Sequence, residues 1–272
     1  MTEKRETLLG CCATIEQYNT VAEAGFDYIE LPGRTLAAIS EDVFHHWKQT
    51  VHGGALPCLG LNAALPAEIK ICGPQFSETK IAEYARLLCR RAAALGVGKI
   101  GIGSPASREL PQDFPIETAW QQTAHFLKLF CAEALPWKIW ILWEPLNPEE
   151  TGFGVDSIEQ AAHIANLQRE GISNIGLVAD LYHMARKEED FRILEQISPF
   201  VRHVHIASPR ADRGFVTEED AAVLKPLVRT CALCLENISA EIFSGQIRVE
   251  GAASLKLLRR WLQEGQATGS YS

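Results

Sequence analysis

The sequence predicts an α/β protein of the (β/α)8 TIM-barrel class, formed as a single domain over residues 1–272. The length of 272 residues is near the ~250 residues typical of such a barrel. Apolar strand-like segments alternate with helix-like segments eight times, and Gly25, Gly96 and Gly171 end helices just before the next strand, where a left-handed C-cap is expected. A doubly wound open sheet is the alternative, but it usually has fewer units and a glycine-rich phosphate turn after strand one, which residues 10–16 lack.

Each predicted strand is a short apolar run, and each predicted helix is longer and amphipathic. The strands are expected at residues 7–14, 26–32, 56–66, 98–105, 138–146, 174–182, 201–208 and 238–243. The helices are expected at residues 15–25, 37–54, 77–96, 116–135, 156–171, 187–198, 217–236 and 251–265. The acidic runs at 187–190 and 217–220 suit the first turn of a helix, where the helix dipole favours negative charge.

Composition and charge restrict the partners of the protein. The formal charge of -8 argues against duplex nucleic acid, because proteins that bind its phosphates are usually basic. There is no apolar run of the ~18 residues that span a bilayer and no signal-peptide core near the N-terminus, so we expect a cytoplasmic protein without a membrane partner. The eight cysteines are expected to be reduced core residues, and the lone Cys231–Cys234 pair provides only half of a zinc site.

Acidic residues and one histidine stand at the ends of four consecutive predicted strands. Glu144 ends the fifth strand, Asp180 the sixth, His205 the seventh and Glu241 the eighth. The carboxyl ends of barrel strands form the working face of this fold, so the four side chains are expected to meet there. Three carboxylates and one imidazole favour one divalent cation, Mn²⁺ or Mg²⁺, with Co²⁺ possible and zinc less favoured. His203 lies one layer deeper on the same face of its strand and is expected to support the site rather than to ligate.

Any one of these four residues could be a solvated loop residue, but four in succession favour a site. Glu30, at the end of the second strand, is expected to be either a rim residue near a substrate or a structural partner of Arg34, with a supporting role preferred. Arg108 is expected to brace loops. Trp143, Phe153 or the loop after the first strand is expected to provide apolar cover that keeps the site dry.

Six segments in this order resemble the xylose isomerase-like TIM-barrel superfamily, and within it the D-tagatose and D-psicose 3-epimerase branch. They read FDYIELP, GSPASREL, EPLNPEE, DLYHM, HVHIAS and SAEIF. The resemblance covers nearly the whole chain and implies a metal-dependent sugar epimerase or isomerase, with possible dimers or tetramers. It implies that one Mn²⁺, Mg²⁺ or Co²⁺ is bound by the residues named above, that Glu144 and Glu241 are the catalytic acid/base pair, and that Glu150 and His183 contact substrate hydroxyls.

The chain departs from this pattern after the seventh strand. Ser208 stands where many members have Asp, and the following loop lacks their Pro-Gly, so either Arg210 or Arg213 could be the arginine that contacts substrate. Asn62, after the third strand, could hydrogen-bond a substrate or be an ordinary loop residue.

Proton removal from a carbon next to a carbonyl, through an ene-diolate, is the chemistry that such a site suits. The same scaffold hosts dehydratases of keto-inositols or dehydroshikimate, which are the first alternative. An endonuclease IV-like nuclease ranks lower, because the second to fourth strand ends lack the histidines it needs. A non-catalytic sugar-binding barrel also ranks lower, because the acid pair Glu144 and Glu241 is intact.

Overall fold

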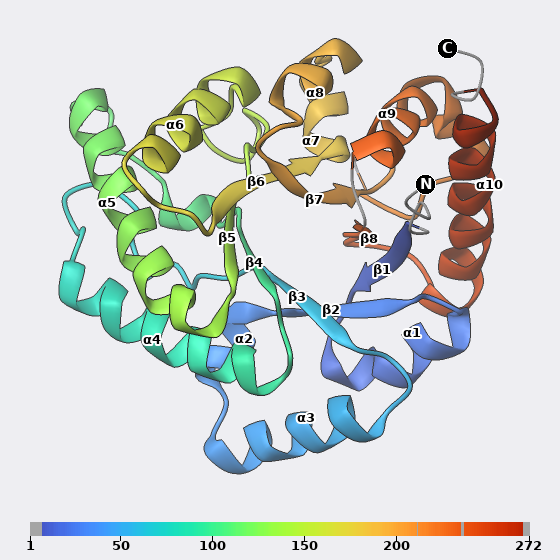
Figure 1. Ribbon diagram of the computed structural model, residues 1–272, viewed down its shortest axis with the longest axis horizontal. Helices are drawn as coiled ribbons and strands as arrows, with labels where there is room; N and C mark the ends of the chain where they lie inside the picture. Colours follow the sequence, from blue (N-terminus) through green and yellow to red (C-terminus); the bar gives the residue numbers. More distant parts are fainter. Residues whose placement is uncertain (1–6, 211, 235–236, 269–272) are drawn as a thin grey trace.

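The computed structural model describes residues 7–210, 212–234 and 237–268, which form a closed parallel barrel of eight strands in the order β1 to β8. Every strand pairs in parallel with its neighbours in sequence, and β8 closes the barrel against β1. The helices lie around the outside, as Figure 1 shows, and the last helix packs against the one before it. The TIM-barrel prediction is therefore confirmed.

The eight strands are short; seven lie within the predicted segments, and β8 begins one residue before its predicted segment at 238–243. Their bounds are β1 Leu8–Cys12, β2 Tyr28–Pro32, β3 Cys58–Asn62, β4 Lys99–Ile102, β5 Trp140–Trp143, β6 Ile175–Asp180, β7 Val201–Ile206 and β8 Asn237–Ala240. The register places Cys12 opposite Glu30, Asp180 opposite His205, and His205 opposite Ser239. These side chains therefore share one level of the barrel, close to the carboxyl ends of the strands.

In the described residues, ten α-helices, four short 3₁₀ helices and one π-helical turn surround the strands. The helices are α1 Tyr18–Ala24, α2 Gly33–Ala38, α3 Glu41–Gly53, α4 Glu78–Ala94, α5 Ile116–Ala134, α6 Ser157–Arg169, α7 Leu181–Arg186, α8 Phe191–Ile197, α9 Ala221–Cys234 and α10 Ala252–Thr268. The 3₁₀ helices and the π-helical turn are η1 Ile15–Gln17, η2 Pro105–Ser107, η3 Leu135–Trp137, η4 Glu218–Asp220 and η5 Ile247–Gly251.

Two of the predicted boundaries are wrong for a local reason. The predicted helix at 37–54 is two helices, because Ser40 is extended and its side chain accepts a hydrogen bond from the Val43 amide, which starts α3. The predicted strand at 174–182 stops at Asp180. Its carboxylate accepts hydrogen bonds from the Tyr182 and His183 amides, which starts α7 and turns the chain away from the barrel.

The apolar core lies mainly between the strands and the surrounding helices, where Val204 and Ile206 of β7 are fully buried. The intervening His203 and His205 are also buried, so β7 alternates as the sequence predicts. Six cysteines are buried and free, in agreement with reduced thiols: Cys11, Cys12, Cys58, Cys72, Cys89 and Cys131. The side chains of Cys231 and Cys234 lie outside the described part. Within that part no helix is long and apolar enough to cross a membrane.

Candidate metal and substrate site

Four side chains from β5 to β8 converge at the carboxyl end of the barrel. Glu144 follows β5, Asp180 ends β6, His205 lies in β7 and Glu241 follows β8. Each offers a potential ligand atom, and these four atoms lie within 4.8 Å of one another. We call these four residues the tetrad. Nδ1 of His205 lies 3.0 Å from Oε1 of Glu144 and 3.4 Å from Oε2 of Glu241.

The backbone of the strand ends fixes the tetrad carboxylates. The amide of Glu144 donates to the carbonyl of Ile102 in β4, and the amide of Glu241 donates to that of Ile206 in β7. One oxygen of Asp180 is committed to capping α7, which leaves Oδ2 turned toward the site. The tetrad is thus held by secondary structure rather than by mobile loops.

Arg213 reaches the tetrad, and Arg210 does not. Nη2 of Arg213 lies 2.8 Å from Oδ2 of Asp180 and 2.5 Å from Oε2 of Glu241, while Nη1 lies 3.4 Å from Oε1 of Glu150. The Arg210 guanidinium instead bonds to Ser208 and Glu219 at the surface. Of the two arginines left open by the sequence, only Arg213 is placed to act at this site.

Two aromatic rings and an unusual backbone conformation hold Arg213 in place. Its guanidinium carbon lies 4.4 Å from the ring centroid of Tyr182 and 4.4 Å from that of Phe243. Its φ of 47° is in the left-handed region, which non-glycine residues rarely adopt. Such strain persists where surrounding contacts over-determine it, and here three carboxylates and two rings do so.

Burial and neighbouring charges move the pKa values of the tetrad apart. Burial, together with the Glu241 carboxylate, raises the pKa of Glu144 to about 7. Burial also acts to raise the pKa of Glu241, but Arg213 and His205 outweigh it and hold this pKa well below its usual range. The raised pKa of Glu144 reflects chiefly the exclusion of water from its buried carboxylate, and the neighbouring Glu241 carboxylate adds to this effect.

The residues of the tetrad fit a divalent cation. Three carboxylates and one imidazole form a hard, oxygen-rich donor set, of the kind that Mn²⁺, Mg²⁺ and Co²⁺ accept. The four atoms already converge without rearrangement of the strands. A bound cation would stabilise the charged form of Glu144, which burial and the Glu241 carboxylate disfavour.

A hydrogen-bond pair beside the tetrad fixes the orientation of His183. Its Nδ1 accepts from the backbone amide and the side-chain amide of Asn147, at 3.2 and 2.9 Å. Burial lowers the pKa of His183 to about 4, so its ring is neutral near pH 7. Its Nε2 then carries the hydrogen and faces Oδ2 of Asp180 at 3.5 Å. Asn147 is a residue of this site that the sequence reasoning missed.

Asn62 brings an unpaired acceptor to the site from β3. Its amide nitrogen lies 3.5 Å from Oε1 of Glu241, and its buried Oδ1 has no hydrogen-bond partner among the described residues. An unpaired buried acceptor costs free energy unless a donor reaches it. A ligand hydroxyl would supply that donor.

A cavity of about 620 Å³ opens above the tetrad. Its polar lining includes Asn62, Glu150, His183 and Arg213, four residues that the sequence suggested as substrate contacts. Its apolar lining includes Cys12, Ala13, Leu65, Leu146, Ile242, Phe243 and Ile247. The expected cover from the loop after β1 is therefore present.

Trp143 and Phe153 do not line the cavity, so the prediction that either of them covers the site is wrong. Trp143 points outward from β5 and donates to the side chain of Gln160 in α6, at 2.7 Å. The ring of Phe153 packs against that of Trp120, with 4.2 Å between the centroids. Strand alternation explains the first error: Trp143 precedes Glu144 and therefore faces the helices.

Arg108 braces this side of the barrel, as the sequence predicts. It is fully buried, and its guanidinium carbon lies 3.9 Å from the ring centroid of Trp143. Its guanidinium group donates to the carbonyls of Ile102, Gly103 and Glu144. Burial lowers its pKa to about 9. Gly103 lies next to it, and a Cβ at that position would overlap with Oε2 of Glu144. The sequence reasoning did not identify this requirement for glycine.

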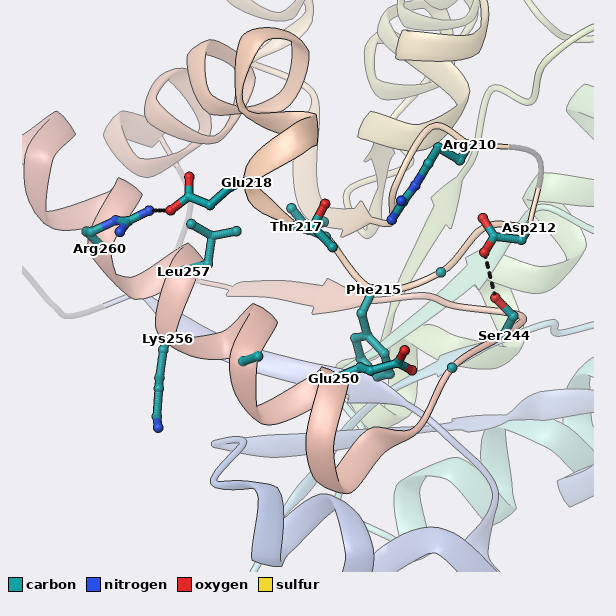
Figure 2. Close-up of a pocket in the computed structure, with 14 residues that line it drawn as sticks. Arg210, Asp212, Phe215, Thr217, Glu218, Ser244, Glu250, Lys256, Leu257 and Arg260 are labelled. Carbon is teal, nitrogen blue, oxygen red and sulfur yellow. Dashed lines mark hydrogen bonds and ion pairs between the residues drawn. The ribbon is translucent and has the colours of Figure 1, made fainter.

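A second cavity of about 600 Å³ lies beside the first, between the segment after β7 and α10. Figure 2 shows the charged groups at its edge, where Glu218 pairs with Arg260 and Asp212 with Ser244. Arg210 lines this cavity rather than the one above the tetrad. The lining holds none of the four tetrad residues.

The closed parallel barrel, with the tetrad at the ends of β5 to β8, places the protein among TIM barrels that have a candidate metal centre at the carboxyl ends of their strands. The family model for the xylose isomerase-like TIM barrel matches residues 18–223, and the chain belongs to this family. A comparison with curated protein sequences finds no match.

Solved structures with the same fold include several sugar epimerases. A D-allulose 3-epimerase from Methylomonas sp., in complex with D-allulose, has a TM-score of 0.76 and 18% identity, over 97% of both chains. An L-ribulose 3-epimerase has a TM-score of 0.74 and 16% identity, over 97% of both chains. A 3-keto-D-glucoside 4-epimerase from E. coli has a TM-score of 0.73 and 16% identity, over 94% of this chain and 100% of that one. At these identities the likeness is one of fold.

Proposed function

We propose that the protein is a divalent-metal-dependent sugar isomerase or epimerase that moves a proton at a carbon next to a carbonyl group, on a ketose or a related keto-polyol. The observation that carries this proposal is the tetrad, whose four ligand atoms lie within 4.8 Å of one another beneath a cavity of about 620 Å³. The membership in the xylose isomerase-like family supports it. The likeness to a D-allulose 3-epimerase in complex with its sugar supports the substrate class.

Glu144, Asp180, His205 and Glu241 would hold one Mn²⁺, Mg²⁺ or Co²⁺ ion. When bound, such an ion stabilises the negative charge that develops on the carbonyl oxygen as the neighbouring proton leaves. The protein supplies the rest: a fixed set of donor atoms, a carboxylate to accept the proton and a second carboxyl group to return it.

Glu144 and Glu241 are the proposed acid/base pair. Both carboxylates approach Nδ1 of His205, at 3.0 and 3.4 Å, and both line the cavity. One carboxylate removes the proton from the sugar carbon, and the other returns it. Return to the opposite face of the same carbon gives epimerisation, and return to the adjacent carbon gives isomerisation.

Four further residues are proposed to orient the sugar. Glu150 and His183 would bond hydroxyl groups, and the unpaired Oδ1 of Asn62 would accept a hydrogen bond from another. Arg213 donates toward the same cavity and is proposed to contact the sugar oxygens. Arg210, the other arginine that the sequence left open, lines the neighbouring cavity, and we do not propose it as a substrate contact.

Incubation of ketose substrates in D₂O with Mn²⁺ tests the proposal. A panel of ketohexoses, ketopentoses and hydroxypyruvate is followed by proton NMR. The proposal expects deuterium at a carbon next to the carbonyl, together with an epimer or an isomer of the substrate. Elimination of water would assign the protein to the dehydratases instead.

Two controls make this result specific. Glu241→Gln removes one member of the acid/base pair with little change of shape, and exchange is expected to disappear while the circular dichroism spectrum stays the same. Glu133→Gln changes an ion-paired glutamate of α5, on the outside of the barrel, and exchange is expected to remain. Equal exchange in the wild type and in Glu241→Gln would exclude the proposed acid/base role.

A further inference from the structure

A column of polar side chains fills the barrel directly beneath the tetrad. Nζ of Lys99 lies 2.8 Å from Nδ1 of His203, and Nε2 of His203 lies 2.5 Å from Oε1 of Glu30. Oε2 of Glu30 then lies 3.3 Å from Nε2 of His205. The interior of such barrels is usually packed with branched apolar side chains, so a buried polar column calls for a specific explanation.

The chemistry of the donors sets the direction of each bond in the column. The Lys99 ammonium group has only hydrogens to offer, so Nδ1 of His203 accepts, and the hydrogen of this ring lies on Nε2 and points to Glu30. Ser239 donates its hydroxyl to Oε1 of Glu30, and its oxygen lies 2.7 Å from the hydroxyl of Tyr28. Oε1 is therefore occupied by two donors, and Oε2 is left for His205.

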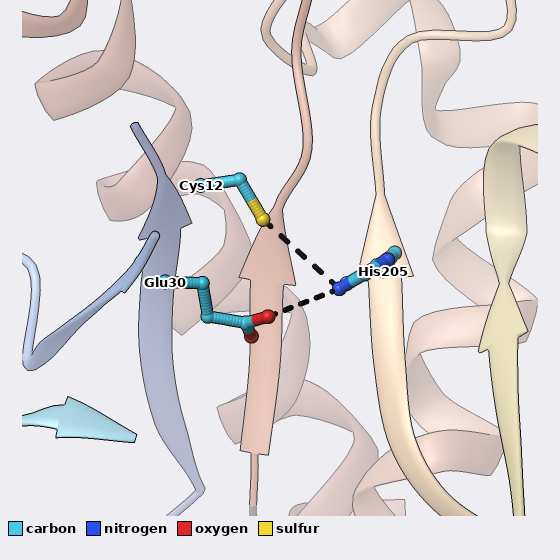
Figure 3. A group of neighbouring side chains, drawn as sticks. All are labelled: Cys12, Glu30 and His205. Carbon is cyan, nitrogen blue, oxygen red and sulfur yellow. Dashed lines mark hydrogen bonds and ion pairs between the residues drawn. The ribbon is translucent and has the colours of Figure 1, made fainter. Parts of the chain in front are cut away.

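His205 uses its two ring nitrogens on opposite sides. Nε2 faces Glu30, and Nδ1 faces Glu144 and Glu241. Figure 3 shows the first of these sides, where the ring edge points across the barrel from β7 toward Cys12 and Glu30. Because a carboxylate only accepts, the contact with Glu30 places a hydrogen on Nε2.

Two glycines make room for this arrangement. A Cβ at Gly60 would lie 2.8 Å from the carboxyl carbon of Glu30, and a Cβ at Gly10 would overlap with the ring of Tyr28. Glu30 is 1% exposed, so its carboxylate is enclosed by protein. The position of the carboxylate is thus set by the shape of the neighbouring strands as well as by its hydrogen bonds.

Cys12, Glu30 and His205 could also be taken for a second metal site, since their ligand atoms converge. The bonds of Glu30 argue against this interpretation. Its Oε1 already accepts from His203 and Ser239, and its Oε2 faces the hydrogen on Nε2 of His205. A nitrogen that carries a hydrogen has no lone pair for a second ion.

We propose that Glu30 is a positioning residue, which holds one hydrogen of His205 on Nε2, so that Nδ1, which faces the carboxylates of Glu144 and Glu241, is the nitrogen that gives up its hydrogen and binds the ion. Lys99 and His203 in turn hold the Glu30 carboxylate. Carboxylate–histidine pairs of this kind fix the tautomer and the ring orientation of metal ligands. The inference rests on the proposed function, since it assumes that the tetrad binds an ion.

Mn²⁺ binding to two variants tests this role. Glu30→Gln keeps the size of the side chain but replaces one oxygen by an amide group that cannot serve both histidines. Gly60→Ala keeps the carboxylate but displaces it. In both variants the Kd for Mn²⁺, measured by electron paramagnetic resonance of the free ion, is expected to rise by about 10- to 100-fold. Gly98→Ala is the matched control, because a Cβ there meets nothing within 4 Å.

A second readout separates positioning from a general structural effect. ¹⁵N-edited NMR of the wild type loaded with diamagnetic Zn²⁺ is expected to show a slowly exchanging hydrogen on Nε2 of His205. This hydrogen is expected to exchange rapidly in Glu30→Gln while the amide spectrum of the barrel stays the same. An Nε2 without hydrogen in the wild type would overturn the proposal, even if neither variant folds.

The remaining outcomes are also decisive. An unchanged Kd in a folded Glu30→Gln or Gly60→Ala protein excludes the positioning role but leaves the proposed function intact. Two Mn²⁺ ions per chain would assign Cys12, Glu30 and His205 to a second site and overturn the proposal. A wild-type protein that binds no Mn²⁺ would overturn the proposed function itself.

Discussion

Nη2 of Arg213 lies 2.8 Å from Oδ2 of Asp180, so a guanidinium group shares a carboxylate with the proposed metal site. The same nitrogen also reaches Oε2 of Glu241. A positive charge at this position lowers the affinity of the tetrad for a cation, because like charges repel strongly where water is excluded. The same charge would attract the oxygens of a sugar. Arg213 is therefore expected to oppose metal binding and to favour catalysis.

The Arg213→Met variant separates these two effects. Removal of the positive charge is expected to tighten Mn²⁺ binding by about tenfold or more, since a few kcal/mol of repulsion is lost. Turnover at saturating Mn²⁺ is expected to fall by about 10²-fold or more, the scale seen when one charge-stabilising donor is removed. Titration with Mn²⁺ and steady-state kinetics measure the two quantities. Arg210→Met should change neither, and weaker Mn²⁺ binding in Arg213→Met would contradict the argument.

Gly103→Ala is expected to disable the site through Glu144. A methyl group on Gly103 would overlap with Oε2 of Glu144, and the short tether to β5 gives this carboxylate little room to move aside. We expect at least about tenfold weaker Mn²⁺ binding, the lower range for disturbed ligand positioning. Gly98→Ala, on the same chain segment but with open space around it, is the control. Isothermal titration calorimetry of both variants measures the difference, and equal affinities would show that Glu144 adjusts freely.

The barrel and the tetrad could be predicted from sequence because each depends on a simple periodic rule. Eight strand–helix pairs predict the barrel. A residue that ends a strand lies at the carboxyl face of the barrel, so residues that end neighbouring strands lie at the same level. Glu144, Asp180, His205 and Glu241 follow from that rule alone, and the structure brings them together. The two arginines after β7 could not be separated in this way, because they lie in a loop whose path depends on tertiary contacts.

The polar column beneath the tetrad was harder to predict because it depends on partners distant in sequence. The bond between Glu30 and His203 joins residues 173 positions apart, and the bond between Lys99 and His203 joins residues 104 apart. Sequence alone suggested Arg34 as the partner of Glu30, since it is close along the chain. The structure gives Glu30 two histidines and Ser239 instead. The only sequence signal for these contacts was the alternation of side chains along β2 and β7, which places Glu30, His203 and His205 inside the barrel.

Arg108→Met is expected to destabilise the whole barrel. Arg108 is fully buried and donates to three carbonyl groups near the ends of β4 and β5; in the variant those of Gly103 and Glu144 would lose this donor, while that of Ile102 keeps the Glu144 amide. Each unpaired buried acceptor costs about 1–3 kcal/mol, so the loss of a donor at two carbonyls is expected to lower the free energy of unfolding by more than about 2 kcal/mol. Urea denaturation followed by circular dichroism measures this loss. Arg86→Met, at an exposed ion pair of α4, should lower the free energy of unfolding far less, and comparable losses in the two variants would contradict the bracing role.

Glu144→Gln is expected to stabilise the chelator-treated protein in a pH-dependent way. Burial raises the pKa of Glu144 from 4.5 to about 7. The folded protein therefore holds this proton more tightly than the unfolded chain, and the free energy of unfolding falls as pH rises from about 4.5 to about 7. Above that range the ionised carboxylate costs the folded state roughly 3 kcal/mol, at about 1.4 kcal/mol for each pKa unit. Glutamine does not titrate and avoids this cost.

Urea unfolding at pH 4.5, 6 and 8 in the presence of EDTA measures the difference between Glu144→Gln and the wild type. The variant is expected to be more stable by up to about 3 kcal/mol at pH 8, and the gap should close toward pH 4.5, where Glu144 is protonated in both states. Glu133→Gln replaces a partly exposed, ion-paired carboxylate instead of a buried one, so its stability relative to the wild type should show no such widening with pH. Excess Mn²⁺ in place of EDTA should reverse the order at pH 8, because a ligand that binds only the folded state stabilises it. A gap that is constant with pH would show that the charge of Glu144 is already balanced by its neighbours and that the tetrad has no need of a cation.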